Sequence, residues 1–127
     1  MRIVRSAGLE FVPAGHENPA DPGALKKVLV AKDDLQPGRI QMINWARIPA
    51  GKSFARHYHE DMQEIFIVVS GQVEITAGAQ SATLAVGDAV LIEAREVHTM
   101  RNLDSAPTDY LAIGVALGTG GRTVLVD

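Results

Sequence analysis

From residue 27 onward, the sequence consists of short runs rich in Val, Ile and Leu that alternate with Gly- and Pro-containing turn signals. Such runs are short for helices, and their close spacing is typical of antiparallel strands joined by turns. The expected strands are 28–31, 40–48, 65–69, 73–77, 82–85, 89–93, 99–103, 109–117 and 123–126. The pattern predicts an all-β domain, built as a sandwich or a barrel.

The first part of the chain lacks this rhythm. Turn-forming residues crowd it: Pro13, Gly15, Pro19, Pro22 and Gly23. We therefore expect an irregular N-terminal arm over residues 1–26, with one short edge strand near 8–12 and a brief helical turn at 22–26. The barrel itself is expected to span 27–127.

Polarity along residues 40–48 indicates how the sheet is covered. Alternation in a strand places Gln41, Ile43, Trp45 and Arg47 on one face and Met42, Asn44, Ala46 and Ile48 on the other. Neither face is wholly polar, so we expect apolar surroundings on both sides, as a closed or sandwiched sheet provides.

Composition excludes several classes of function. A length of 127 residues favours one domain, and a dispersed net charge of −3 gives no electrostatic footprint for nucleic acid or an anionic membrane. No run approaches the ~20 apolar residues of a membrane span, and Met1–Arg5 does not begin a signal peptide, so a cytoplasmic protein is expected. The sequence has no cysteine, so a metal site must use imidazole and carboxylate.

Three of the four histidines lie in the strand-rich part of the chain. His57 and His59 are two residues apart and share one face of an extended chain. A turn through residues 60–63 would return Glu64 to the same space, and His98 could close the site from a neighbouring strand. Imidazole with one carboxylate suits a divalent Mn, Fe, Co, Ni, Cu or Zn ion better than Mg or Ca.

These spacings also allow a site without metal. Two histidines on one strand face can simply meet solvent, and Glu64 can be a charge at a strand edge. Four protein ligands would leave about two positions open on a six-coordinate ion, whereas tetrahedral Zn would be saturated and structural.

Glycine spacing adds a second line of inference. Gly51, five residues, His57-x-His59, four residues, Glu64, six residues and Gly71 match the first motif of the cupin family. Gly87, His98 and Asn102 resemble its second motif, although Glu93 replaces the usual proline and Arg95 the usual glycine. The motifs together cover residues 51–102, about two-fifths of the chain.

The resemblance implies a jelly-roll barrel of two packed antiparallel sheets. It also implies one divalent transition-metal ion per chain, held by His57, His59, Glu64 and His98, and a homodimer formed through edge strands. Because Glu93 and Arg95 stand in a turn, the bend before His98 must form without proline and glycine.

Further residues are assigned from strand alternation and from their distance to the motifs. Alternation from the ligands predicts a pocket wall of Phe66, Val68, Met100 and Asn102. Glu64 is the candidate base if the site is catalytic. His16 lies far from both motifs in sequence, and we expect it on the surface rather than as a fifth ligand.

The resulting hypothesis is a metal-binding cupin acting on a small organic molecule, through dioxygenase or isomerase/lyase chemistry. The alternative is a non-catalytic metal or small-ligand binding or sensor module. A sugar-phosphate isomerase relative is a further possibility, but it requires a Lys and Arg cluster that is not evident in the sequence.

Overall fold

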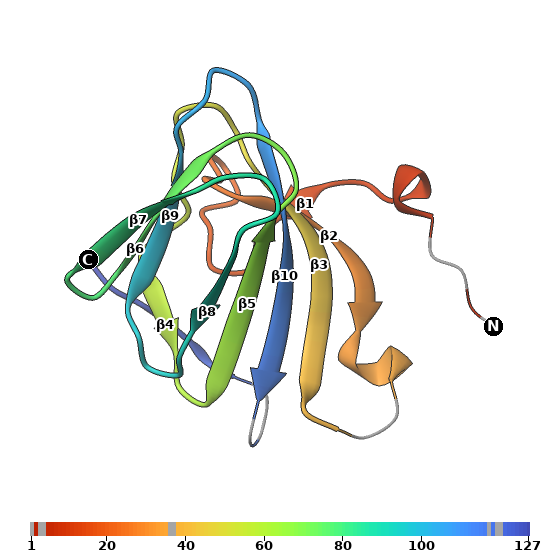
Figure 1. Cartoon of the computed structure of the whole chain (residues 1–127). Coiled ribbons are helices and arrows are strands. Elements are labelled where there is room, and N and C mark those ends of the chain that lie inside the picture. Colours follow the sequence, from red (N-terminus) through yellow and green to blue (C-terminus); the bar gives the residue numbers. More distant parts are fainter. Residues whose placement is uncertain (1, 3–4, 36–37, 117, 119–120) are drawn as a thin grey trace.

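A computed structural model describes residues 2, 5–35, 38–116, 118 and 121–127. The described residues form two antiparallel sheets that face each other (Figure 1). The six-stranded sheet has the order β1 (Val12–Pro13), β2 (Leu25–Ala31), β3 (Ile40–Ile48), β10 (Thr108–Ala116), β5 (Met62–Val68) and β8 (Ala89–Ile92). The five-stranded sheet has the order β11 (Thr123–Leu125), β4 (His57–His59), β9 (His98–Asn102), β6 (Val73–Ala77) and β7 (Gln80–Leu84). The all-β, two-sheet prediction is confirmed.

The expected strands agree with the observed ones to within a few residues at their ends. The arm carries its strand at Val12–Pro13 rather than at 8–12, and this strand pairs with the start of β2. The helical turn expected at 22–26 is wrong, because Leu25 and Lys26 already belong to β2. Leu117, the expected end of the strand 109–117, lies outside the described residues.

The described helical segments are two short 3-10 turns, η1 (Ser6–Gly8) and η2 (Lys32–Asp34). In the described ranges, no helix is long and apolar enough to cross a membrane.

The main core lies between the two sheets. Burial alternates strictly along β5 and, from Tyr110 onward, along β10, so every second side chain turns inward, as the two-residue period of a strand requires. The largest buried apolar side chains include Ile48, Phe54, Val73, Ile92 and Met100. This packing holds the facing strands at fixed positions and so determines where their polar side chains can meet.

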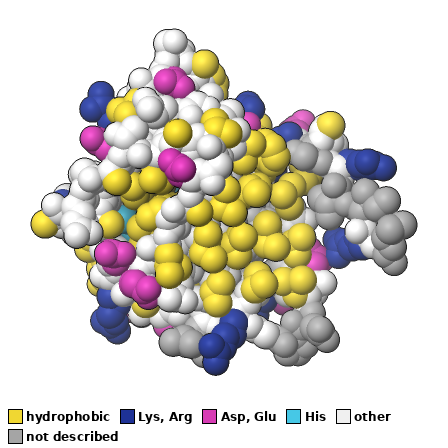
Figure 2. Space-filling view, in the orientation of Figure 1, with side chains coloured by type: hydrophobic (Ala, Val, Ile, Leu, Met, Phe, Trp, Pro, Cys, Tyr) yellow, Lys and Arg dark blue, Asp and Glu magenta, His cyan; other side chains and the backbone are white. Residues whose placement is uncertain are grey.

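The outward side of the six-stranded sheet is also apolar. One row crosses five strands through successive register partners: Val30, Ile43, Ile113, Ile65 and Leu91. A second row contains Trp45, Leu111 and Ile67. We call these eight residues the outer apolar face. Figure 2 shows hydrophobic side chains gathered over β3, β10 and β5, and Leu91 is 51% exposed.

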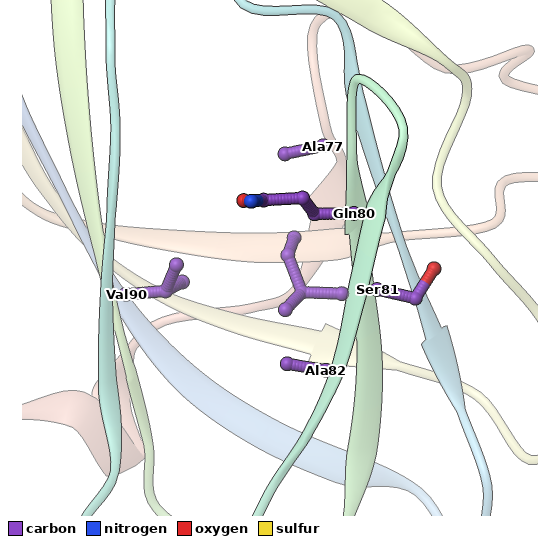
Figure 3. Close-up of a pocket in the computed structure, with 6 residues that line it drawn as sticks. Ala77, Gln80, Ser81, Ala82 and Val90 are labelled. Atoms are coloured by element: carbon purple, nitrogen blue, oxygen red, sulfur yellow. The ribbon is translucent and has the colours of Figure 1, made fainter.

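A cavity of about 380 Å³ opens where the edge strands β7 and β8 approach each other. Gln80 and Ala82 point toward Val90 across this gap, whereas Ser81 points away (Figure 3). None of the residues that line it is titratable. The cavity therefore carries no acid–base or metal-binding group.

Candidate metal centre

Four potential ligands converge in the interior from three strands. His57 and His59 lie on β4 and His98 on β9, all in the five-stranded sheet, and Glu64 lies on the facing β5. His57 and His98 are direct register partners. Because β4 and β5 are joined by a tight connection, Glu64 faces the histidines from the opposite sheet. The cluster thus spans the two sheets (Figure 1).

The ligand atoms are close together and buried. One nitrogen of each histidine and one oxygen of Glu64 lie within 4.8 Å of one another. Glu64 Oε1 is 2.7 Å from His59 Nε2, 3.3 Å from His98 Nε2 and 4.0 Å from His57 Nε2. Each of the four residues is at most 6% exposed. Solvent therefore does little to screen the charge of Glu64.

Backbone oxygen atoms fix the orientation of the imidazole rings. His57 Nδ1 lies 2.6 Å from Ala55 O, and His98 Nδ1 lies 2.8 Å from Glu96 O. His59 Nδ1 lies 3.3 Å from Gly121 O. His59 Nδ1 also lies 3.1 Å from the hydroxyl of Thr123, which can donate or accept. Since a carbonyl only accepts, Nδ1 of His57 and of His98 must be the protonated nitrogen, and each of these two rings, when neutral, directs the Nε2 lone pair at the cluster. This is the tautomer that a metal ligand needs.

Burial and neighbouring charges shift the pKa values of the cluster residues in different directions. Burial, assisted by the neighbouring His16, lowers the pKa of His57 to about 3, so this ring is neutral at pH 7. Burial alone would raise the pKa of Glu64, but His59 and His98 outweigh it and lower that pKa to about 2. Burial opposes protonation of His59 as well, yet the charge of Glu64 prevails and raises the pKa of His59. The site therefore presents an anionic Glu64 and a neutral His57, and the raised pKa of His59 means that a metal ion must displace a proton from that ring.

The unpaired atoms of the cluster match the needs of a cation. Glu64 Oε1 and the Nε2 atoms of His57, His59 and His98 are buried without a hydrogen-bond partner. Leaving such atoms unpaired is costly, and lone pairs only 2.7 Å apart repel unless a proton or a cation lies between them. Three imidazoles and one carboxylate are also a donor set that divalent transition metals prefer. The residues present fit such an ion.

The bend before His98 forms without the proline and glycine of the family motif. Glu93 N donates to Glu96 Oε1 at 3.1 Å, and Glu96 N donates to Glu93 O at 3.2 Å. Arg95 adopts a φ of 66°, the left-handed conformation that favours glycine, and its N–H donates to His59 O at 2.7 Å. The turn thus ties the His98 loop to β4 while accepting backbone strain at Arg95.

A pocket leads to this cluster. An inner cavity of about 70 Å³ reaches Glu64, Phe66 and Tyr110. An outer chamber of about 490 Å³ reaches Glu64 and His59. The two share Gly15, His16, Lys26, Met42, Asn44 and Glu64 and so form one continuous pocket. Its size suits one small organic molecule.

The four predicted wall residues have different surroundings. Phe66 lines the inner cavity and lies 5.9 Å from the His98 ring between centroids. Val68 and Met100 pack in the main core. Asn102 donates to Ile48 O and Ala106 O, and its Oδ1 accepts from Asp104 N and Thr108 Oγ1. Asn102 therefore orders the loop that precedes β10.

His16 is not a surface residue, and that expectation is corrected here. Its ring stacks on His57 with centroids 4.1 Å apart, and its Nδ1 lies 2.7 Å from Glu17 Oε2. Glu17 also accepts hydrogen bonds from Gly23 N and Ala55 N, which fastens the arm over the pocket. Ala55, which donates to Glu17, lies 38 residues further along the chain, so no local sequence signal could have indicated that the arm covers the pocket.

Lys26, Lys32 and Asn44 were also missed as pocket residues. Asn44 shares with Met42, Ala46 and Ile48 one of the two faces predicted for its strand, and that alternation was the available signal, although it did not say which face points inward. The two lysines stand in or beside the supposed arm, where no motif marks them.

Comparisons with known proteins identify the family and the fold of this chain. The family described as "Cupin domain" matches residues 44–114. A mannose-1-phosphate guanylyltransferase from Salmonella muenchen is 29% identical over 79 residues, which are 62% of this chain but only 17% of that enzyme. The chain therefore spans a small part of this curated relative.

Several solved structures share the fold. A predicted oxalate decarboxylase from Thermotoga maritima superposes with a TM-score of 0.80 at 20% identity, covering 91% of this chain and 100% of that one. A sugar phosphate isomerase from Silicibacter pomeroyi gives 0.78 at 21% identity, covering 99% and 82%. A polyketide cyclase from Streptomyces resistomycificus gives 0.77 at 16% identity, covering 100% and 87%. At these identities the likeness concerns the fold alone.

Proposed function

This chain belongs to the cupin domain family, and from that premise we propose that it is a metal-dependent protein acting on a small organic molecule. The observation that carries the proposal is the set of four buried, unpaired ligand atoms on His57, His59, Glu64 and His98. Removing such atoms from water is tolerated where a bound ion satisfies them. We propose that these residues hold one divalent transition-metal ion.

A bound ion would supply Lewis acidity to a chelating substrate, and iron would also permit oxygen chemistry. The chain itself binds and orients the substrate. Its ligands approach from β4, β5 and β9, while the pocket reaches Glu64 from the side of β2 and β3. Phe54 and Phe66 flank the ring of His98 and limit the access of water.

Proton transfer falls to few groups in this pocket. Glu64 is anionic at neutral pH and is the candidate base. Burial raises the pKa of Tyr110, so its hydroxyl stays protonated and can serve only as a hydrogen-bonding group. Lys26 and His16 line the same inner cavity and are further groups that can exchange protons. We place dioxygenase chemistry first because it needs little proton transfer from side chains, and isomerase or lyase chemistry second.

The burial of all four ligands, each at most 6% exposed, favours a second candidate, a non-catalytic metal or small-ligand binding module. Anaerobic loading with Fe(II), followed by oxygen-uptake assays with diketones, catechols and hydroxy acids, separates the two. We expect uptake that depends on one substrate class and is lost in His57→Ala. Metal binding with no substrate-dependent uptake or turnover would support the binding module instead.

We also propose a homodimer, formed through the outer apolar face rather than through edge strands. The outer apolar face spans five strands about 4.8 Å apart and two residue rows, which gives it an apolar area on the order of 300 Å². A standard interface buries about 800 Å² per partner around an apolar centre and a polar rim. Arg47 and Gln63 would contribute to that rim. A second copy suits this face because a two-fold axis would pair the same apolar rows of both copies.

A further inference from the structure

One buried polar atom outside the metal ligands has no hydrogen-bond partner. Among the described residues, five buried side-chain atoms are unpaired; four belong to the ligand cluster, and the fifth is Asn44 Oδ1. Asn44 is 6% exposed, lies on the inward face of β3 and lines both the inner cavity and the outer chamber. A metal ion at the cluster would not satisfy Asn44 Oδ1, whereas a hydrogen-bond donor on a bound molecule would.

The same pocket is positively charged. Lys26 lines both of its parts and Lys32 lines the outer chamber, whereas Glu64 is the one carboxylate among the lining residues. Neither lysine forms an ion pair with another described residue. A divalent ion at the cluster would more than offset the charge of Glu64. Positive charge therefore concentrates here in a chain whose net charge is −3.

The two lysines and Asn44 Oδ1 recognise different chemical groups. Ammonium groups attract carboxylate or phosphate oxygens, and the Asn44 carbonyl accepts a hydrogen bond from a hydroxyl. Glu17, an acid on the arm, is engaged by Gly23 N, Ala55 N and His16 and forms no ion pair with either lysine. A volume of about 490 Å³ accommodates one sugar-sized molecule.

We propose that this pocket binds a hydroxylated organic anion, with its carboxylate or phosphate at Lys26 and Lys32 and a hydroxyl donating to Asn44 Oδ1. The inference rests on the proposed function, because other oxygens of the same molecule would face the metal. It narrows the substrate class to hydroxy acids and sugar acids or phosphates. Neutral diketones and catechols lack the anionic group that the lysines recognise.

Calorimetric titration of the Zn-loaded protein provides the test. The probes are gluconate, glucose 6-phosphate and the uncharged sorbitol, all at one ionic strength. We expect at least one anion to bind about tenfold or more tightly than sorbitol. The ratio between gluconate and glucose 6-phosphate distinguishes a carboxylate site from a phosphate site. Equal binding of sorbitol, or no binding of either anion, would overturn the inference.

Variants assign the recognition to these residues. Lys26→Met keeps the side-chain length and removes the charge, and it should weaken binding of the preferred anion about tenfold while leaving Zn affinity unchanged. Lys32→Met, at an exposed position, repeats the test should Lys26→Met fold poorly. Asn44→Leu should reduce the preference for hydroxylated anions over acetate or inorganic phosphate. Lys52→Met, outside this pocket and paired with Asp21, is the matched control.

The outcomes separate the two proposals. If the protein takes up no Zn in the preceding metal titration, the proposed function fails. If Zn binds at the cluster but Lys26→Met and Lys32→Met bind the anions as tightly as the unmodified protein, only the present inference fails. Circular-dichroism melting of each variant identifies any loss of the fold.

Discussion

The two faces of the six-stranded sheet differ in polarity although the same strands build both. Neighbouring residues diverge: Asn44 and Glu64 point inward, whereas Trp45 and Ile65 point outward. The inner face is polar where it meets the pocket, and the outer face is apolar across five strands. The inner face carries the main core as well as the pocket, and a small sheet protein more often exposes a polar outer face than an apolar one. We therefore propose an occupant for each face, an ion with its ligand inside and a second copy outside.

The inner face should respond most strongly to substitution. Glu64→Gln keeps the shape of the side chain but removes the single anionic donor among four buried ligands. We expect Zn or Co affinity to fall more than about 100-fold, as measured by competition with a chromophoric chelator. Gln63→Ala, one residue away and outward-facing, is the control and should bind metal normally. A loss of less than threefold in Glu64→Gln would remove Glu64 from the site.

Substitution on the outer apolar face should have the next largest effect. Ile113→Glu places a charge at the centre of the longer apolar row, between Ile43 and Ile65. The dimer should weaken by about 30-fold or more, because a charge would be buried at the middle of the interface. Light scattering after size exclusion should then report the mass of one chain, with metal content unchanged.

Gln80→Glu adds the same charge on the other sheet and should leave the dimer intact. A monomeric unmodified protein would instead refute the pairing of this face. An unchanged mass in Ile113→Glu would place the interface elsewhere.

Lower pH should weaken metal binding at the inner face and leave the outer apolar face unaffected. His59 has a raised pKa, so a proton must leave it when a metal binds, and lower pH should weaken binding about tenfold per unit for each such proton. His57 and Glu64, with pKa values lowered to about 3 and about 2, carry no proton to release near neutrality. Co(II) titrations between pH 5.5 and 7.5 should therefore show an affinity that falls as the pH is lowered, because binding releases the proton of His59. A Co(II) affinity that does not change over this range would contradict the raised pKa of His59.

The smallest effect is expected in the loop that delivers His98 to the inner face. Arg95 holds a φ of 66°, a conformation that costs a side chain about 1 kcal/mol and glycine almost nothing. Arg95→Gly should raise the free energy of unfolding by roughly that amount, less the extra freedom of glycine in the unfolded chain. Urea denaturation of the metal-free protein measures it. A destabilised variant would show that the Arg95 side chain contributes more than its backbone costs.

Residues with local signals were the predictable ones. The alternation over Ile40–Ile48 identified both faces of β3, and the two-residue spacing of His57 and His59 placed them together. The bend at Arg95 was predicted as a position that usually requires glycine, and its positive φ explains why.

Residues positioned by long-range contacts were not predictable. His16 reaches the pocket because Glu17 binds Ala55, a contact that depends on the path of the whole arm. Lys26 was assigned to that arm, yet pairing with Ala46 places it on the inward face of β2. The register between distant strands has no signature within either strand alone.

Metal analysis of the protein purified without an affinity tag tests the central claim most directly. Inductively coupled plasma mass spectrometry, followed by titration of the chelator-stripped protein, should find about one divalent transition-metal ion per chain, lost in Glu64→Gln and retained in Gln63→Ala. If the purified protein holds no such ion, and the stripped protein takes up none of Mn, Fe, Co, Ni, Cu or Zn, the cluster of three histidines and Glu64 is not a metal site.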